Sequence, residues 1–478
     1  MTGQQWRATA LAFVAGALER IGIIDGERFR PTMELAWPRI VTGFAIMSEQ
    51  TADLAMVGAA VGTAGTAGLA FALGYWQIVT LLGLGVAGGT VTLVSQNYGG
   101  EATDRASLAV TQSVVLATAL ALPIMGLFLA VPDPLIGLLG AGPDALRHGS
   151  VYLVYVAPAV VFELLNLIAS RTYTGVGDTF TEMVARAGGA ALNVVLSGAL
   201  IFGFGLGAAG AAIGTTLASG FVTLVLAWGM LGRTYGRLGM EPSPVPIARD
   251  GPWLEPTLLY QLIEISLPEI GRRLAQGAVV FPLLWIAASF GPVVVTALEV
   301  GRRVRALINS VNWGLSLASS SLVGQHLGAG DEDEAGAYGA AIIRLSAVLY
   351  TGVTVLVVVF ARPIAGVFVA GSAEIVQAAV FVAVGAVSSI GYGIDGAAAG
   401  ALLGAGDTRW PFVASLLGRY AFALPAAALG LVTPLGVGGL YLALFLETAV
   451  PGGINYWLFR NGRWKAVSRR YRPSTEPG

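Results

Sequence analysis

Two acidic residues lie one helical turn apart in a part of the chain that is otherwise apolar. Glu49 and Asp53 are four residues apart, and side chains at that spacing stack on one face of an α-helix. Two carboxylates in a desolvated environment repel each other's charge, so at least one of them would hold a proton near neutral pH. Such a group can bind a proton and an organic cation in turn, because the proton removes the charge that the cation needs. The pair therefore predicts a cation-exchange site.

The surroundings of these acids are those of a membrane protein. Hydrophobic residues make up 55% of the chain and charged residues 12%, whereas about 25% charged residues is usual in soluble domains. The mean hydropathy is +0.74. Residues 54–100 and 187–232 contain no Asp, Glu, Lys or Arg, and each stretch can hold two helices of about 20 residues. The alternating pattern of transmembrane strands is absent, so the sequence predicts an all-α polytopic membrane protein.

The apolar stretches predict twelve transmembrane helices in two sets of six. The first set lies near residues 35–59, 66–95, 106–131, 149–171, 181–204 and 207–232. The second set lies near residues 259–289, 293–324, 337–361, 375–402, 411–432 and 436–459. We therefore expect an N-lobe over 33–232 and a C-lobe over 258–460, joined by a proline-containing cytoplasmic linker over 233–257.

The distribution of arginines predicts the orientation of these helices. Arginines gather in the loops on the side of both termini, and the other side holds only Arg147 and Arg362. By the positive-inside rule both termini are cytoplasmic, with residues 461–478 as a basic tail, in a multi-pass protein of the cell membrane.

The segment before the first predicted span requires a separate interpretation. Residues 1–32 contain a short uncharged run that is too short to cross a bilayer. We expect a cytoplasmic interfacial helix with Trp6, Phe13 and Leu18 against lipid. A cleaved signal peptide is the alternative.

The two sets of helices repeat one another at a constant offset. Gly-Val-Gly-Asp178-Thr recurs 229 residues later as Gly-Ala-Gly-Asp407-Thr, and Gln96 corresponds to Gln325 at the same offset. A constant offset over such a length indicates two copies of one fold unit. Repeats of this kind are the usual architecture of secondary transporters.

Four kinds of motif resemble those of MATE (multidrug and toxic compound extrusion) transporters of the archaeal or prokaryotic type. The run Thr51–Gly58 looks like the Asp-containing first helix of that family. LVSQNYGG and LVGQHLGAGDEDEA look like its Gln-Gly-rich motif, TGVGDT and LGAGDT like its Gly-Asp-Thr motif, and LNVVL followed by GLGAAGAA like its helix five to six segment. The resemblance covers residues 33–460. It implies two six-helix lobes forming a V, alternating access, and export of organic cations or drugs against inward H⁺ or Na⁺.

The same resemblance implies a coupling-ion site in the N-lobe. Carried over by position, its residues are Asp53, Asn193 and Thr215, and the bend-forming proline of the first helix is Pro38. Members often carry a second Asp four residues after the Asn, and here that position is Ser197. The loss of this carboxylate leaves the coupling ion and its stoichiometry open. Transient Na⁺ at Asp53 and Asn193 is the only metal expected.

Other polar residues within the spans are candidates for the substrate cavity, because charge at membrane depth usually marks function. Asp395 and Asn166 occupy the same repeat position, so one lobe carries a carboxylate where the other carries an amide. Glu163 lies one turn before Asn166. A helix-packing hydrogen bond is the alternative for Asp395. Glu447 is expected to form a structural pair with Arg419.

A cluster of charges early in the C-lobe is assigned to structure or gating. Glu299 and Arg303 are spaced for an internal ion pair, with Arg302 beside them and Arg272 and Arg273 on the preceding span. Positive charge repels the expected organic cations. An anionic substrate would instead make these arginines its binding site.

Several other classes of protein are disfavoured. The chain has no Cys and only two, widely separated, His, so it lacks the paired ligands or nucleophiles of a membrane-embedded enzyme. No cofactor and no nucleic-acid partner are expected, and nothing resembles a channel's selectivity filter. The closest alternative is a flippase for lipid-linked saccharides, whose pyrophosphate the arginines could hold. We expect a monomer that transports small molecules.

Overall fold

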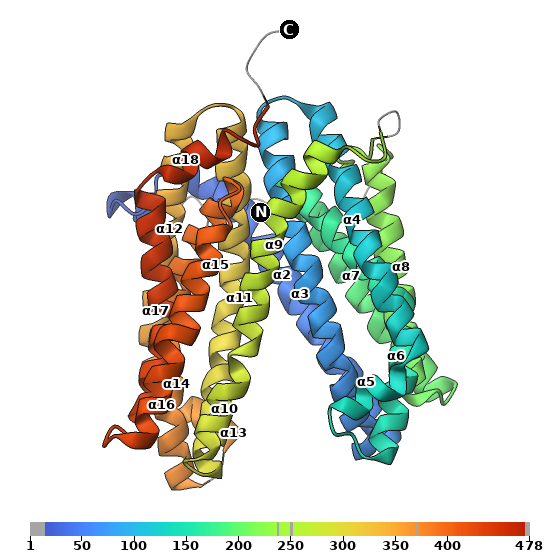
Figure 1. Cartoon of the computed structure of the whole chain (residues 1–478), viewed down its shortest axis with the longest axis vertical. Coiled ribbons are helices and arrows are strands. Elements are labelled where there is room, and N and C mark those ends of the chain that lie inside the picture. The colour runs from blue at the N-terminus through green and yellow to red at the C-terminus, as the bar shows by residue number, and fades with distance from the viewer. Residues whose placement is uncertain (1–14, 237–238, 249–251, 370, 474–478) are drawn as a thin grey trace, which may run out of the picture. The chain divides into compact units, whose positions relative to one another are not determined.

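The computed structural model describes residues 15–236, 239–248, 252–369 and 371–473, and within these residues all regular elements are helices (Figure 1). The chain divides into two compact units. The N-terminal unit is Pro38–Ile270, and the C-terminal unit is Gly271–Gly478 together with the residues before Pro38. The division falls inside two helices, α2 (Gly26–Val61) and α9 (Pro256–Ala278). Pro38 therefore marks the point where α2 passes from one unit to the other.

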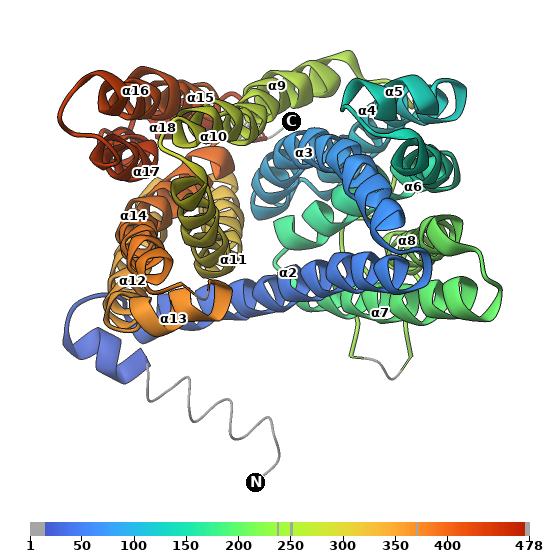
Figure 2. The same ribbon diagram turned by 90° about the horizontal axis from the view of Figure 1, so that it is seen from below.

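The N-terminal unit contains most of α2 and the helices that follow it. These are α3 (Thr63–Gly99), α4 (Thr103–Ala130), α5 (Pro132–Leu138), α6 (Pro143–Gly175), α7 (Thr179–Gly198) with its π-helical extension η1 (Ala199–Gly203), and α8 (Gly207–Met230). Helix α6 lies beside α3 and α8 (Figure 2). Its apolar side chains pack into a core with those of α3, α4 and α8.

The C-terminal unit contains the end of α9 and the rest of the chain. Its helices are α10 (Val280–Ala288), α11 (Pro292–Gly328), α12 (Glu332–Val359), α13 (Ala361–Phe368), α14 (Ser372–Gly404), α15 (Arg409–Leu416), π-helical η2 (Leu417–Ala423), α16 (Leu424–Val432), α17 (Gly438–Arg460) and α18 (Arg463–Ser468). Helix α14 packs against α11, α12 and α17.

The sequence repeat is a repeat of helices. Helices α3, α4 and α6 each begin and end 229 residues before α11, α12 and α14, respectively. The central helix of one unit, α6, thus corresponds to the central helix of the other, α14. The prediction of an all-helical fold built from two repeated units is confirmed by these bounds.

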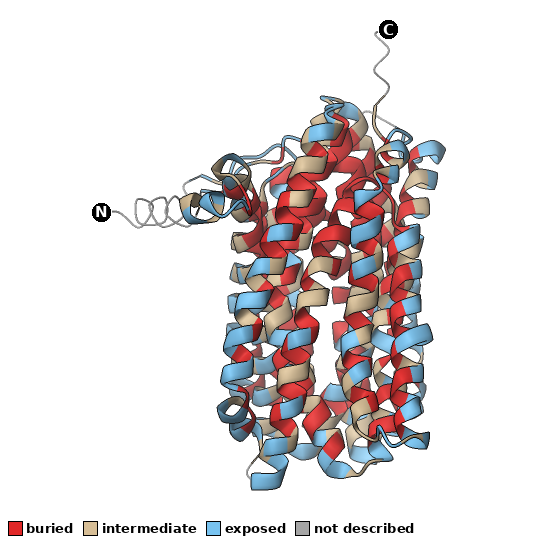
Figure 3. Cartoon of the chain, turned by 90° about the vertical axis from the view of Figure 1, so that its left-hand side faces the viewer, coloured by how far each residue is buried: buried red, intermediate tan, exposed pale blue. Residues whose placement is uncertain are grey.

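The outer surfaces of the helices suit a bilayer. Among the described residues, eight helices are long and apolar enough to cross a membrane: α3, α4, α6, α7 with η1, α8, α12, α14 and the stretch from α15 to α16. The other four predicted spans fall on α2, on α9 with α10, on α11 and on α17. Exposed residues run along the outward faces of the helices (Figure 3). Large apolar side chains such as Leu224, Phe281 and Trp285 are at least 70% exposed, which a membrane protein tolerates because they face lipid.

Close helix contacts depend on glycine. In the N-terminal unit, a Cβ atom added at Gly85 of α3 would lie 2.1 Å from Ile270 of α9, and one added at Gly89 would lie 2.4 Å from Ser266. Helices in lipid associate through such close backbone packing, because burying apolar surface gives no gain there. The two glycines therefore position α9 against α3.

Two Gly-Asp motifs end one helix and start the next. Gly177 adopts a positive φ of 93°, and the Asp178 side chain accepts a hydrogen bond from the Thr181 amide at 2.9 Å. Asp331 caps α12 in the same way, accepting from the Glu334 amide at 3.0 Å. Both arrangements are N-caps after a left-handed glycine turn. Asp178 therefore has a structural role at the junction of two helices.

Acidic side chains in the first turn of α12 hold both ends of the described chain. Arg469 donates two hydrogen bonds of 2.8 Å to Glu332. Arg28 donates to Glu334 at 2.9 and 2.8 Å. All four residues belong to the C-terminal unit, so the start of α2 and the basic tail are fastened to the same helix end.

The segment before α2 is expected to lie at the membrane interface. Trp6 and Phe13 lie outside the described residues. Leu18 is half-buried and packs against the apolar core of the C-terminal unit. The helix that carries the first predicted span begins at Gly26, within the segment 1–32.

The contact between Glu332 and Arg469 predicts a pH-dependent stability. The hydrogen bonds from Arg469 hold the pKa of Glu332 below its ordinary value, against the effect of slight burial, and the charges of Arg469 and Arg472 act in the same direction. A lowered folded-state pKa stabilises the fold above the unfolded value of about 4.3, and this contribution is lost as the pH falls through the folded value. We expect Glu332→Gln to lower the Tm at pH 7 and to lower it progressively less as the pH falls below the unfolded value.

The matched control for this measurement is Asp104→Asn. Asp104 is an exposed acid in the first turn of α4, the repeat counterpart of α12. Thermal denaturation in detergent should show no comparable pH-dependent difference for this variant. Equal pH dependence in both variants would contradict the assignment to the ion pair.

Candidate functional site

Four predicted site residues meet inside the N-terminal unit. Asp53 comes from α2, Asn193 and Ser197 from one face of α7, and Thr215 from α8. The Thr215 hydroxyl oxygen lies 3.3 Å from Asp53 Oδ2 and accepts a hydrogen bond from Asn193 Nδ2 at 3.0 Å. The Ser197 hydroxyl donates to Asn193 Oδ1 at 3.4 Å. Residues from three helices thus form one polar cluster, which we call the Asp53 site.

The Asp53 carboxylate is buried without an opposite charge on it. Asp53 is 5% exposed, and Asn193 and Ser197 are fully buried. Asp53 Oδ1 accepts no hydrogen bond within the described residues, although the Ser197 and Asn193 side chains lie close enough to interact with the carboxylate. A buried carboxylate with an unsatisfied oxygen is costly unless it is paired or protonated. The geometry is suited to taking up a proton or a small cation.

Ser197, where related proteins often have a second Asp, is tightly enclosed. A Cβ atom added at Gly214 of α8 would lie 2.4 Å from Ser197 Oγ. The absence of a side chain at Gly214 therefore gives the Ser197 hydroxyl its space. The neutral hydroxyl leaves Asp53 as the only carboxylate in the Asp53 site.

Glu49 is partly buried on α2, one turn from Asp53. It makes no ion pair within the described residues, and the charges that act on it are those of Asp53, Arg186 and Glu163. Glu49 therefore lies between the Asp53 site and a second, fully paired group of charges.

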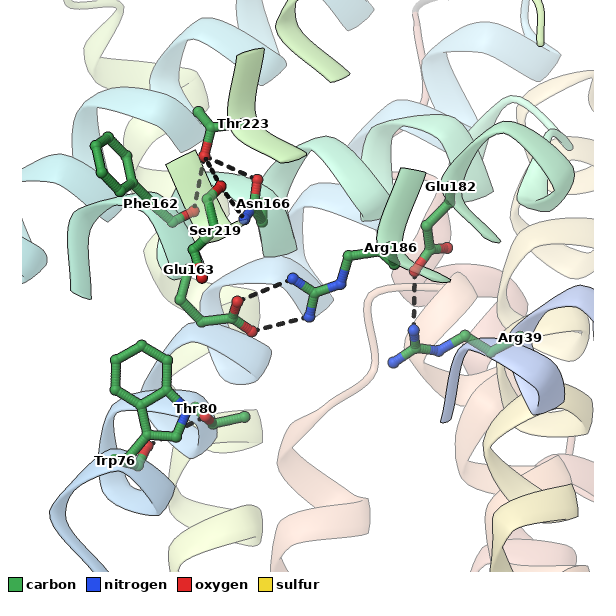
Figure 4. Close-up of polar contacts among 10 residues, drawn as sticks. All are labelled: Arg39, Trp76, Thr80, Phe162, Glu163, Asn166, Glu182, Arg186, Ser219 and Thr223. Atoms are coloured by element: carbon green, nitrogen blue, oxygen red, sulfur yellow. Dashed lines mark hydrogen bonds and ion pairs between the residues drawn. The ribbon is translucent and has the colours of Figure 1, made fainter. Parts of the chain in front are cut away.

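This second group consists of two buried ion pairs (Figure 4). Arg186 of α7 donates to both carboxylate oxygens of Glu163 on α6, each at 2.9 Å. Arg39 of α2 donates to Glu182 of α7 at 2.8 Å. All four side chains are at most 10% exposed. Each acid is thus neutralised by an arginine, in contrast to Asp53.

Asn166 uses both ends of its amide to join α6 to α8 (Figure 4). Its Nδ2 donates to the Ser219 carbonyl at 3.1 Å, and its Oδ1 accepts from the Thr223 hydroxyl at 2.9 Å. The residue is fully buried. This geometry is that of a helix-packing contact, whereas the sequence indicates a cavity-lining role for Asn166.

Asp395, at the corresponding position of the C-terminal unit, has a different environment. It is 4% exposed and accepts a hydrogen bond of 2.6 Å from Asn455 of α17. The side chain of Asn312 on α11 lies against the neighbouring Gly396, where an added Cβ would be 1.8 Å from its Oδ1. Asp395 is thus a second buried acid whose hydrogen-bonded neighbour is neutral.

The charges of α11 pair differently from the prediction. Glu299 lies 3.8 Å from Arg302, three residues away, and Arg303 is exposed. The predicted pair of Glu299 with Arg303 is therefore wrong, because the Arg303 side chain leaves the helix on its exposed side. Arg272 is buried on α9, and both Arg272 and Arg273 make contacts there.

Glu447 pairs with a different arginine from the one expected. Its Oε1 accepts a hydrogen bond of 2.9 Å from Arg305 of α11. Arg419 instead donates to Ser415 at 2.7 Å. The prediction that Glu447 pairs with Arg419 is therefore wrong. Arg419 is nevertheless near enough for its charge to act on Glu447.

The sequence interpretation missed Arg39 and Arg186 as partners of buried acids. A usable signal was present, since an acid inside a span requires a counter-charge or a proton. Arg186 and Glu182 lie only one turn apart on α7, which favoured a local pair that does not form. Within the described residues, no group of three or more Asp, Glu, His or Cys could hold a metal ion.

Comparison with known proteins places the chain in a family. The MatE family model matches residues 38–198 and 270–429, more than half of the chain. The chain belongs to the MatE family. Members of this family are membrane transporters that use ion coupling rather than a bound cofactor.

The relatives of this MATE transporter cover nearly its whole length. It is 26% identical over 467 residues to the probable multidrug resistance protein NorM of Rhodopseudomonas palustris. The matched region covers 96% of this chain and 95% of the relative. It is 26% identical over 425 residues to the multidrug resistance protein PmpM of Pseudomonas aeruginosa, covering 86% and 87% of the two chains. A crystal structure of a MATE protein in the bent conformation matches with a TM-score of 0.84 at 19% identity, over 93% and 97% of the two chains. The fold predicted from the motifs is confirmed.

The paired acids of the MATE transporter should respond to substitution differently from the unpaired ones. Glu163→Gln leaves Arg186 buried without its counter-charge, and breaking a buried pair costs about 3–5 kcal/mol. We expect a large fall in Tm for the detergent-solubilised protein. Glu49→Gln, which breaks no ion pair, should change the Tm far less. A Tm loss of similar size in both variants would contradict the assigned pairing.

Proposed function

We propose that this chain exports organic cations or drugs from the cell by antiport, with the Asp53 site holding the coupling ion. The observation that carries the proposal is the buried Asp53 carboxylate, which among the described residues has a neutral hydrogen-bonding partner, no arginine partner and one oxygen that accepts no hydrogen bond. The two repeat-related units would move against each other, so that the binding sites open first to one side of the membrane and then to the other, as in other transporters built from repeats. The names of the multidrug resistance relatives support drugs as substrates.

The charge of Asp53 supplies the physical link between ion and drug. An ionised carboxylate in a low-dielectric environment attracts any cation, and a bound proton or Na⁺ removes that attraction. Ion and cationic drug would therefore occupy the transporter in alternation. One proton moving inward through 100 mV releases about 2.3 kcal/mol, enough for roughly 50-fold accumulation.

The coupling ion is either H⁺ or Na⁺. Hard cations prefer oxygen ligands, and the side chains around Asp53 offer the oxygens of Asn193, Ser197 and Thr215. The same carboxylate could accept a proton, since no arginine pairs with it among the described residues. With one carboxylate in the site, we propose exchange of a single positive charge there.

We further propose that the protein works as a monomer in the cell membrane with both termini in the cytoplasm. One chain already contains both repeated units. The loops on the side of the termini carry most of the arginines, which is the cytoplasmic side by the positive-inside rule. Asp395 would be a further acid of the substrate route in the C-terminal unit, because it is buried beside Asn455 without an arginine partner.

The flippase alternative is less favoured by the contacts of the arginines. A lipid-linked pyrophosphate carries several negative charges, whereas Glu447 and Glu299 already offset much of the charge of Arg305 and Arg302. Arg272 and Arg273 also make contacts within the protein. The transport assay below separates the two functions, since a flippase would not move a water-soluble cation.

The proposal is tested with Asp53→Asn in proteoliposomes. Efflux of a fluorescent organic cation is measured with a pH gradient and, separately, with a Na⁺ gradient. The wild type should respond to one of them, and Asp53→Asn should fold and insert normally but lose gradient-driven efflux, because the amide cannot exchange its charge. Asp133→Asn, a change at an exposed acid at the start of α5, serves as the control. Undiminished efflux in Asp53→Asn would overturn the assignment.

A further inference from the structure

Three arginines of the C-terminal unit lie near enough to one carboxylate for their charges to act on it. Arg302 and Arg305 come from α11, Arg419 from the π-helical segment η2, and Glu447 from α17. The charges of all three arginines act on the Glu447 carboxylate. We call these four residues the arginine cluster.

The ion pair at the centre of this cluster is buried. Arg305 Nη2 lies 2.9 Å from Glu447 Oε1, and the two side chains are 11% and 8% exposed. Arg419 is 2% exposed, and its Nη1 donates to the Ser415 hydroxyl at 2.7 Å. A hydroxyl satisfies one donor of a guanidinium group but leaves its charge in place.

The cluster carries more positive than negative charge. Glu447 can neutralise one of the three arginines. Glu299, which is 46% exposed, lies 3.8 Å from Arg302. Among the described residues Arg419 makes no ion pair, so its positive charge is not offset by an acid in contact with it. An uncompensated charge buried in a membrane protein is costly, and it usually has a functional reason.

Two buried donors of the cluster have no acceptor. Arg305 Nη1 and Arg419 Nε make no hydrogen bond within the described residues. Arg419 also lies in a π-helical segment, and such segments occur frequently at functional sites. An oxyanion would both offset the excess positive charge and accept hydrogen bonds from these two donors.

We propose that the arginine cluster binds a carboxylate or phosphate group through Arg302, Arg305 and Arg419. The planar guanidinium groups match these oxyanions in geometry, and charge-assisted hydrogen bonds to them are strong. Arg302, whose side chain is 20% exposed, gives the cluster an exposed edge from which an anion can enter. The bound group belongs to a transported solute or to a lipid headgroup. The transporter would thereby accept zwitterionic or anionic molecules besides organic cations.

This proposal does not depend on the coupling assigned to Asp53. The arginine cluster lies wholly within the C-terminal unit, and Asp53 lies within the N-terminal unit. Binding at the cluster can be measured on the purified protein without any gradient. If Asp53→Asn did not affect transport, the anion site would be unaffected by that result. If the arginine cluster bound no anion, the coupling role of Asp53 would likewise be unaffected.

The experiment compares two dyes that differ only in one charge. A rhodamine with a free benzoic acid group is zwitterionic, whereas its methyl ester is a cation of nearly the same shape. Binding of each dye to the full-length protein in an uncharged, lipid-free detergent is followed by fluorescence anisotropy. We expect Arg302→Gln and Arg419→Gln each to weaken binding of the free acid about tenfold relative to the ester, the effect of one charge-assisted hydrogen bond.

Two further variants guard against misfolding and general charge effects. Arg303→Gln removes an exposed arginine next to Arg302 and should leave the ratio of the two affinities unchanged. Glu299→Gln removes the partly exposed carboxylate that lies 3.8 Å from Arg302 and should strengthen binding of the acid. Because Arg302 is partly exposed, its variant should fold even if Arg419→Gln does not. Equal changes for acid and ester in the Arg302 variant, or no change for either dye, would overturn the proposal.

Competition identifies the source of the oxyanion. Sodium benzoate should displace the free-acid dye if the site takes the acid group of a solute. Short-chain phosphatidylglycerol, but not the matching diacylglycerol, should displace it if the site takes a lipid phosphate. Displacement by neither compound would contradict an oxyanion site.

Discussion

The exclusion of uncompensated charge from the bilayer governs how the acids of this protein are arranged. Glu163, Glu182 and Glu447 are each hydrogen-bonded to an arginine. Asp53 and Asp395 are equally buried, but their hydrogen-bonded partners are neutral, Thr215 and Asn455 respectively. A paired acid stabilises the fold, whereas an unpaired one must obtain its neutralising charge from a proton, an ion or a substrate. The pairing pattern thus separates structural acids from acids that are available for transport.

The two repeated units share helix bounds but not their polar residues. Helices α6 and α14 correspond over their whole length, yet Asn166 of α6 joins two helices through neutral hydrogen bonds and Asp395 of α14 keeps a carboxylate at the same position. The position equivalent to Asp53 in the second repeat is Pro282, in α10. Duplication preserved the apolar faces that pack the helices and allowed the buried charges to diverge. Each unit can therefore contribute a different step to a transport cycle.

The periodic and repeated features of this chain could be predicted from its sequence, and the side-chain partners could not. Helix positions follow from apolar stretches and from the offset of 229 residues, which reappears in the helix bounds. Asp53, Asn193 and Thr215 could be grouped only through the family motifs, since they lie on three helices far apart in sequence. Arg186 was within reach of Glu182 on its own helix, but it bonds to Glu163 across α6 and α7. Pairing between side chains on different helices depends on the rotation of each helix about its axis and on the side-chain rotamers. Hydrophobic periodicity in the sequence does not report either of them.

The buried polar centres of the two units also differ in sign. The Asp53 site has one carboxylate and no arginine among its described contacts, so it is negative when ionised. The arginine cluster has three arginines against Glu447, so it stays positive at any physiological pH, because arginine does not lose its proton. A proton or Na⁺ at Asp53 changes the charge of one unit while the other remains fixed.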